Sequence, residues 1–180
     1  MEICTNDLLF AMATALDAVE KSLVGVSDGH GRRVAYIAVK MAQADGRYTD
    51  SQLMDLAGCA ILHDNALTEY IQAELSRKRD LANWPNGYNL GSHCTAGENN
   101  ISVLGFDKAL ENAVLYHHEE ADGSGPFGKT ADETPFAAQL IHLADMVDVR
   151  FDIGNITAAK AEAISDELAK GAEASSAMKP

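Results

Sequence analysis

Residues 59–64 read CAILHD, an apolar stretch that ends in a histidine followed by an aspartate. The stretch continues a helical pattern of apolar residues, so the doublet His63-Asp64 closes a helix. Adjacent helical side chains point about 100° apart, and these two reach one site only if it lies over the helix end. Further histidines and a carboxylate occur in order on both sides. The candidate metal ligands are His30, His63, Asp64, His93, His117, His118 and Asp145.

These residue types predict a metal centre. Neutral imidazole and ionised carboxylate suit borderline divalent cations such as iron, manganese, zinc or nickel. The set is too large for one four-coordinate ion, and a carboxylate such as Asp64 can bridge two. Asp145 lies between Ile141 and Val149 on a largely apolar helix, where an ionised carboxylate is costly unless a cation or strong donors compensate it. We therefore predict a binuclear site.

Other interpretations apply to single residues of this set. A lone histidine on an apolar helix is more often a hydrogen-bonded core residue than a ligand, so only the ordered set favours ligation. His118, as the second of two adjacent histidines, is a ligand or a residue that orients one. His142 lies outside the set, one turn from Asp145, and is a supporting or structural residue. Glu119 is a candidate for orienting a histidine ligand.

Apolar residues at three- and four-residue steps predict an all-α domain without strands. The first helix follows a Thr5-Asn6-Asp7 cap and carries the apolar stripe Leu8, Met12, Leu16, Val19 and Leu23. Loops are predicted at 83–87 and 121–135, where glycine and proline concentrate. The remaining predicted helices cover residues 34–45, 50–64, 68–79 (polar and exposed), 93–104, 107–118, 135–147 and 157–170. We expect one helical bundle over residues 1–171, with the binuclear site in its core and a disordered tail at 172–180.

Composition excludes several classes of protein. The formal charge of −13 argues against broad binding to nucleic acid or to an anionic membrane. A small anionic substrate stays possible, because two cations would supply local positive charge. The chain has no apolar run of the roughly 18 residues that span a bilayer, and no basic leader precedes its first helix. Three cysteines without CxxC spacing favour a reduced, cytoplasmic setting.

The chain resembles the HD superfamily of metal-dependent phosphohydrolases, and within it the HD-GYP group of bacterial cyclic di-GMP phosphodiesterases. The resemblance runs from about residue 9 to 148 and includes the HD doublet itself. The matching stretches are HGRRVAYIA at 30–38, CAILHD at 59–64, HCTAG at 93–97, YHHEEADGSG at 116–125 and LADMVD at 143–148. It implies an HD-type helical bundle and a role in bacterial signalling.

Four departures make this a degenerate member of the group. Asn65-Ala66-Leu67 stands where the group has Ile-Gly-Lys after the doublet, so the lysine is missing. Pro126-Phe127 replaces Tyr-Pro, and residues 149–152 replace a stretch that ends in Arg-Pro-Tyr. Val26 occupies the place of a carboxylate that binds a third metal in some members. Two metals are therefore implied.

The resemblance also implies roles for the site residues. His30, His63, Asp64 and Asp145 would hold one metal, and Asp64 would bridge to a second. The second metal's other ligands would be His93, His117 and His118. Iron or manganese is favoured, with zinc, nickel or magnesium possible. A hydroxide between the metals would attack phosphorus in line, with Asp64 as the catalytic carboxylate.

Four residues are candidates for binding the substrate, a small anionic nucleotide or phosphate ester. Arg33 would hold a phosphate oxygen, or is simply a surface arginine. Gly123 and Ser124 would offer donors from a loop that is otherwise only a turn. Lys129 would replace the missing lysine.

Three functions stay open at this stage. The first is hydrolysis of cyclic di-GMP or a related nucleotide. The second is a catalytically degenerate, metal-containing signalling or nucleotide-binding module. The third is a di-iron oxygenase of the HD type. A homodimer or a signalling partner protein is possible in each case.

Overall fold

The computed structural model describes residues 5–23, 25–76 and 91–166, and within these ranges the chain is helical. The described part contains no strand, only an isolated bridge between Asp122 and Thr130, so the all-α prediction is confirmed. The six longer helices are α1 (Thr5–Leu23), α2 (His30–Asp45), α3 (Asp50–Ile61), α4 (Leu67–Ser76), α5 (Gly91–Ile101) and α6 (Phe136–Phe151).

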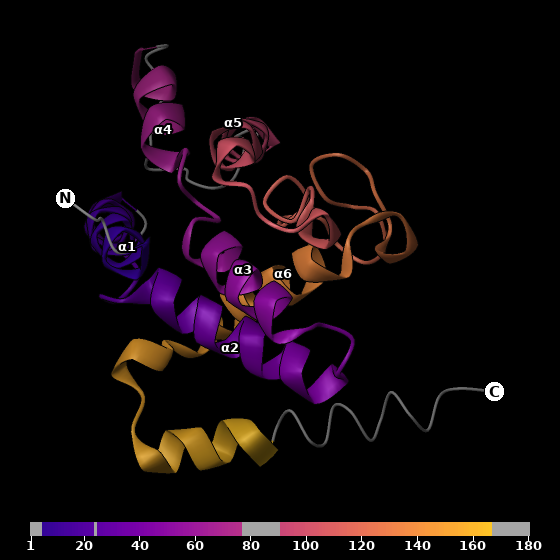
Figure 1. The fold of residues 1–180 in the computed structure, drawn as a ribbon. Coiled ribbons are helices and arrows are strands. Elements are labelled where there is room, and N and C mark those ends of the chain that lie inside the picture. Colours follow the sequence, from indigo (N-terminus) through magenta and orange to yellow (C-terminus); the bar gives the residue numbers. More distant parts are fainter. Residues whose placement is uncertain (1–4, 24, 77–90, 167–180) are drawn as a thin grey trace.

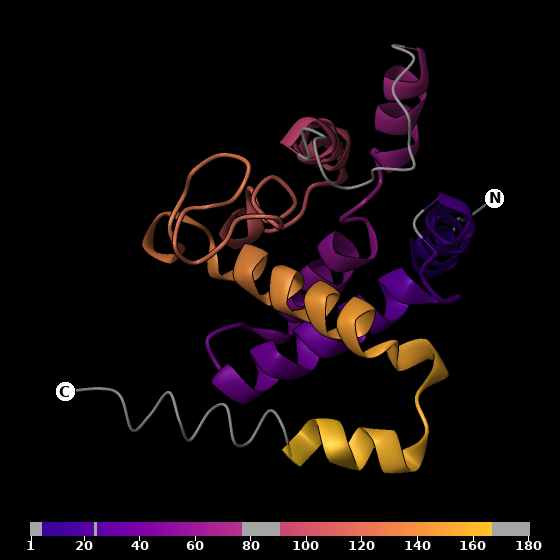
Figure 2. The same ribbon diagram turned by 180° about the vertical axis from the view of Figure 1, so that it is seen from behind.

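The centre of the molecule is formed by α2, α3 and α6. Figure 1 shows α2 and α3 in front of α6. In Figure 2, the view from the opposite side, α6 lies in front and crosses them. Their small and branched side chains interlock, with Val34, Leu56 and Ile141 fully buried. Local signals fix the helix ends. Thr49 forms a capping box with Gln52 at the start of α3, and Gly46 ends α2 in the left-handed conformation, φ 83°.

Two predicted helices differ from the structure. Residues 107–118 do not form a helix: after a short 3₁₀ turn, Lys108–Leu110, the chain continues as successive turns, with Asn112 at φ 66°. The polar helix predicted at 68–79 is α4, which is not simply exposed, because Leu67, Tyr70 and Ile71 form a small buried cluster. Helix 93–104 was predicted correctly as far as Ile101, and residues 102–104 tighten into a 3₁₀ turn.

Only part of the apolar stripe predicted for α1 faces inward: Leu16 packs against the core. Leu8 and Met12, at the start of that stripe, are exposed. The buried positions are Ala13, Asp17 and Glu20, spaced as one stripe of a helix. A surface helix that buries two carboxylates in preference to leucine and methionine needs partners for them.

The rest of the chain follows the prediction where it is described. The loop after residue 120 and the helix that follows Pro135 are present, and residues 158–166 form a last helix after a 3₁₀ turn at Ile153–Asn155. The predicted loop at 83–87 and tail at 172–180 lie outside the described residues. In the described part, no helix has the length and apolar character needed to cross a membrane.

Candidate metal centre

The HD doublet lies in a turn directly after α3. His63 is fully buried, and its Nδ1 lies 2.9 Å from the carbonyl oxygen of Ala60, which leaves Nε2 directed away from the helix. The Asn65 amide braces the turn by donating to the carbonyl oxygens of Leu62 at 2.7 Å and Gly97 at 3.1 Å. The helix end is therefore held against α5, and the doublet has a fixed orientation.

One group of potential ligand atoms comes from the central helices. His30 begins α2, His63 follows α3 and Asp145 lies in α6, and their ligand atoms all lie within 4.8 Å of one another. We call these three residues the His30-side group. His30 is oriented through both ring nitrogens: Nδ1 lies 2.7 Å from Asp148 Oδ2, and Nε2 lies 3.2 Å from Asp145 Oδ1.

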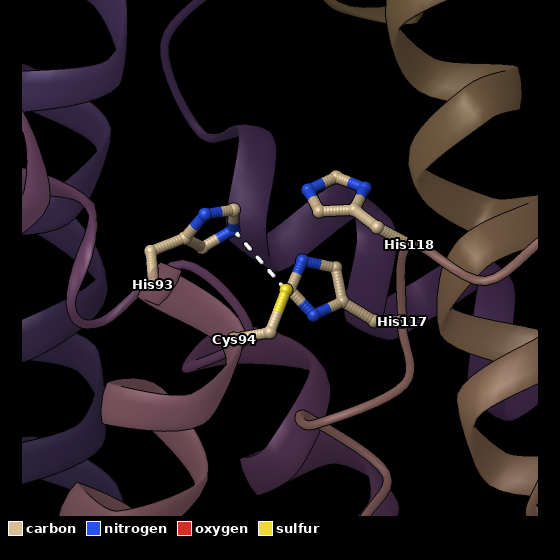
Figure 3. A group of neighbouring side chains, drawn as sticks. All are labelled: His93, Cys94, His117 and His118. Atoms are coloured by element: carbon tan, nitrogen blue, oxygen red, sulfur yellow. Dashed lines mark hydrogen bonds between the residues drawn. The ribbon is translucent and has the colours of Figure 1, made fainter. Parts of the chain in front are cut away.

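A second group comes from α5 and the turn segment after residue 110. It comprises His93, Cys94, His117 and His118, again with ligand atoms within 4.8 Å of one another, and we call it the His93-side group. Figure 3 shows its three imidazole rings gathered around the Cys94 sulfur, which lies 3.7 Å from His93 Nε2. His117 Nδ1 is held by the Val114 carbonyl oxygen at 2.6 Å, so its Nε2 points into the group.

Asp64 lies between the two groups and offers one oxygen to each. Its Oδ2 lies 3.7 Å from His63 Nε2, and its Oδ1 lies 3.2 Å from His93 Nε2 and 3.4 Å from His117 Nε2. Burial alone would raise the pKa of this carboxyl, but the histidines around it, His63 foremost, hold the pKa well below its usual value. Asp64 is therefore an ionised carboxylate whose two oxygens lie toward different histidine-rich groups.

Unpartnered polar atoms test whether metal ions fit here. His63 Nε2, Asp64 Oδ1 and His117 Nε2 are buried, and none of them has a hydrogen-bond partner in the part of the chain that the structure describes. Buried polar atoms normally find partners, and three orphans at one point need an explanation. All three are good donors to divalent cations, so a metal centre at this position accounts for them.

The two groups differ in how they hold protons. Burial acts to lower the pKa of His30, but its hydrogen bonds to Asp145 and Asp148 raise that pKa to about 10. Burial lowers the pKa of His117 and, with the help of His117, lowers that of His118 well below its usual value. His117 and His118 are therefore neutral and ready to bind a cation, whereas His30 must first lose a proton.

Comparison with known proteins identifies the fold. No protein-family model and no curated protein matches the chain. A solved structure does: a cyclic GMP-AMP specific phosphodiesterase of V. cholerae, with a TM-score of 0.65 at 20% sequence identity over 91% of this chain. The chain has the fold of that phosphodiesterase. It spans 44% of the length of the V. cholerae chain, and the likeness establishes the fold alone.

In the His93-side group, the backbone segment before His117 and His118 is held by one carboxylate. Glu98 of α5 accepts backbone N–H groups from Asn112 at 2.7 Å and from Val114 and Leu115 at 3.0 Å. These bonds replace the carbonyl partners that a helix would have supplied. They are the physical reason that residues 111–118 do not form a helix. The turn segment so fixed carries His117 and His118.

The four predicted substrate-binding residues are held by neighbours within the chain. Arg33 donates to both oxygens of Asp148, at 2.6 and 2.9 Å, and its remaining nitrogen to the Asp28 carbonyl. Lys129 pairs with Glu133 at 3.2 Å. Gly123 adopts φ 81° in the loop, and the Ser124 N–H donates to the Asp122 carboxylate at 3.0 Å. Their roles in binding a substrate stay predictions.

Glu119 and His142, the two predicted supporting residues, contact the backbone near the His93-side group. Glu119 accepts the N–H groups of Phe127, at 2.7 Å, and of Lys129, so it organises the loop and does not orient a histidine. His142 Nδ1 lies 2.9 Å from the His117 carbonyl oxygen and supports that segment.

Sequence reasoning did not single out Cys94, Asp148, Glu98 or Glu20. Asp148 was detectable in principle, because it lies three residues after Asp145 and so on the same face of α6. Cys94 is adjacent to His93, but nothing in the sequence places its sulfur among the imidazoles. Burial, and secondarily the charge of Asp64, raises the pKa of its thiol, so that it stays protonated at neutral pH.

Proposed function

We propose that this chain is a metal-dependent phosphodiesterase that hydrolyses a cyclic dinucleotide at a binuclear centre. The observation that carries the proposal is the position of Asp64, with one oxygen directed to each of two histidine-rich groups. The fold shared with the V. cholerae phosphodiesterase supports it. The matching stretches of sequence around His63, His117 and Asp145 support it independently.

The candidate ligands would bind two cations. His30, His63 and Asp145 would hold one, His93, His117 and His118 the other, and Asp64 both. Bound there, the cations would supply a nucleophile at neutral pH and neutralise charge on the phosphate and leaving oxygen. The chain's own part is to fix the ligands: Asp148 orients His30, and the Val114 carbonyl orients His117. We infer iron or manganese, with zinc, nickel or magnesium possible, because these ions accept imidazole nitrogen and carboxylate oxygen, and burial keeps the Cys94 thiol protonated.

The substrate class follows from charge and from the two resemblances. The chain carries a net charge of −13, so an anionic substrate must be attracted locally, by the cations. The sequence resembles cyclic di-GMP phosphodiesterases, and the solved structure with the same fold is named for cyclic GMP-AMP. Cyclic di-GMP and cyclic GMP-AMP are therefore the first substrates to test.

A second candidate function is a metal-containing nucleotide-binding module without turnover. One observation favours it: Leu67, at the place of the group's lysine, is buried against Tyr70 and Ile71. The two predicted cationic contacts, Arg33 and Lys129, already face carboxylates. This candidate shares the metal centre and differs only in the absence of product.

The test separates the two. Protein purified without chelator is analysed for metal and incubated with each cyclic dinucleotide in Mn²⁺ or Fe²⁺, alongside the variant Asp64→Asn. Two ions per chain and a linear dinucleotide, both lost in the variant, are expected. Two ions with tight binding but no product would favour the binding module. A chain that takes up no metal under any loading would refute both.

A further inference from the structure

Helix α1 carries a buried carboxylate, Glu20, with one oxygen that has no hydrogen-bond partner among the described residues. Glu20 is 3% exposed, and its Oε2 forms no hydrogen bond. An ionised carboxylate removed from water without a partner is strongly destabilising. A sequence under no other constraint would place an apolar residue at this position, as the same helix does with Ala13 two stripe positions earlier.

The other buried carboxylate of α1 shows what a satisfied one looks like. Asp17 lies three residues before Glu20 on the same face and accepts the backbone N–H of Gly31 at 3.1 Å. It also lies 3.5 Å from the Arg32 guanidinium. Asp17 therefore fixes α1 against the first turn of α2, next to His30. Figure 1 shows α1 lying beside this end of α2 and the end of α3.

Glu20 lies one helical turn beyond Asp17 on the same buried face of α1. Helix α1 packs against α2 and α3, the helices that position His30 and His63. The charges that act on its carboxyl are those of His63, Asp64, His30 and Asp17, in that order of strength. Burial raises the pKa of Glu20 to about 7, although the charges of His63 and His30 act to lower it.

We propose that Glu20 is a further carboxylate ligand of the cation held by the His30-side group, and that metal binding thereby ties α1 to the bundle. The inference rests on the proposed metal centre. It assigns the site a ligand that lies ten residues before His30 and before the first of the five matching stretches, HGRRVAYIA at 30–38. It also explains why α1 turns Asp17 and Glu20 inward while Leu8 and Met12 face water.

The decisive variants are Glu20→Gln and Glu20→Leu, compared with Asp17→Asn as the matched control on the same helix face. In the metal-free protein, removing an unsatisfied buried charge leaves the melting temperature unchanged or raises it, most clearly for Glu20→Leu. In both Glu20 variants Mn²⁺ binds the His30-side group at least about tenfold more weakly, measured by competition with a chelator. Asp17→Asn lowers the melting temperature with and without Mn²⁺, and its Mn²⁺ affinity falls less than that of the Glu20 variants, because Asp17 positions α1 and does not bind the cation.

Hydrogen exchange of the α1 amides gives a readout independent of activity. Mn²⁺ slows their exchange in the wild-type protein and not in the Glu20 variants. Wild-type Mn²⁺ affinity in both Glu20 variants, with α1 still protected by metal, would overturn the inference and leave the proposed centre intact. Failure of the wild-type protein to bind Mn²⁺ would overturn the centre and the inference together.

Discussion

The two halves of the candidate centre are built in different ways. The His30-side group stands on the ends and faces of α2, α3 and α6, the helices that also form the core. The His93-side group takes His117 and His118 from a segment of turns, whose backbone is fixed by the Glu98 carboxylate. The first half therefore inherits its geometry from packing, and the second from three hydrogen bonds to one side chain.

The largest effect is expected where the halves meet. Asp64→Asn removes a charge that both groups share, so both ions are lost and hydrolysis falls by more than about 10²-fold. Metal analysis and the cyclic dinucleotide assay measure the two losses. Asp132→Asn, at an exposed carboxylate, is the control. Retention of both ions by the Asp64 variant would contradict a bridging role.

Glu98→Gln tests the half that depends on hydrogen bonds. The neutral amide keeps one acceptor oxygen but loses the charge, which costs about 2–3 kcal/mol of unfolding free energy because bonds to an ionised acceptor are the stronger ones. The His93-side ion is lost while the His30-side ion remains, so metal analysis gives one ion per chain. Urea unfolding measures the stability change. Loss of both ions would mean that the halves are not independent.

Asp148→Asn tests the half that depends on helices. The amide no longer offers charged oxygens to His30 and Arg33, so the imidazole is less firmly oriented. Loss of such support typically weakens metal binding by about 10- to 100-fold. Competition with a chelator should show this loss for one ion only. Equal weakening of both ions would contradict the assignment of Asp148 to the His30-side group.

The pH dependence of metal binding tests the same half without a substitution. Protonated His30, with a pKa of about 10, competes with a cation at every pH below that value. The affinity of the His30-side group therefore rises with pH, by about tenfold per unit between about pH 7 and 9. His117 and His118 are neutral throughout this range because burial lowers their pKa. Calorimetry in buffers of different ionisation enthalpy counts the protons released, and release should accompany one ion.

The same contrast governs what the sequence predicts. The periodicity of α2, α3 and α6 predicts these helices. His30 and Asp145 lie on α2 and α6, and the HD doublet follows the end of α3, so the sequence predicts both the fold and the His30-side group. The turns at 111–118 are not, because the apolar spacing of Leu110, Val114 and Leu115 is typical of a helix. The competing bonds come from Glu98, whose effect depends on tertiary contact and has no local signal.

Helix α1 shows a second limit. Its apolar stripe correctly predicts a helix, but the buried face contains Asp17 and Glu20 instead. Hydrophobic periodicity reports which face would be buried if apolar contact alone decided the matter. It gives no weight to a carboxylate whose burial is compensated by α2 or, as proposed here, by a cation.

The pairing of Arg33 with Asp148 has a consequence for the order of binding. Its guanidinium is engaged with Asp148, Ser27 and Asp28, and Lys129 is engaged with Glu133. Under the proposed function, neither side chain brings an uncommitted positive charge to an arriving phosphate. An apoprotein with an overall charge of −13 would repel the nucleotide. Loading is then sequential: the cations enter first, and only the charged centre they create admits the dinucleotide.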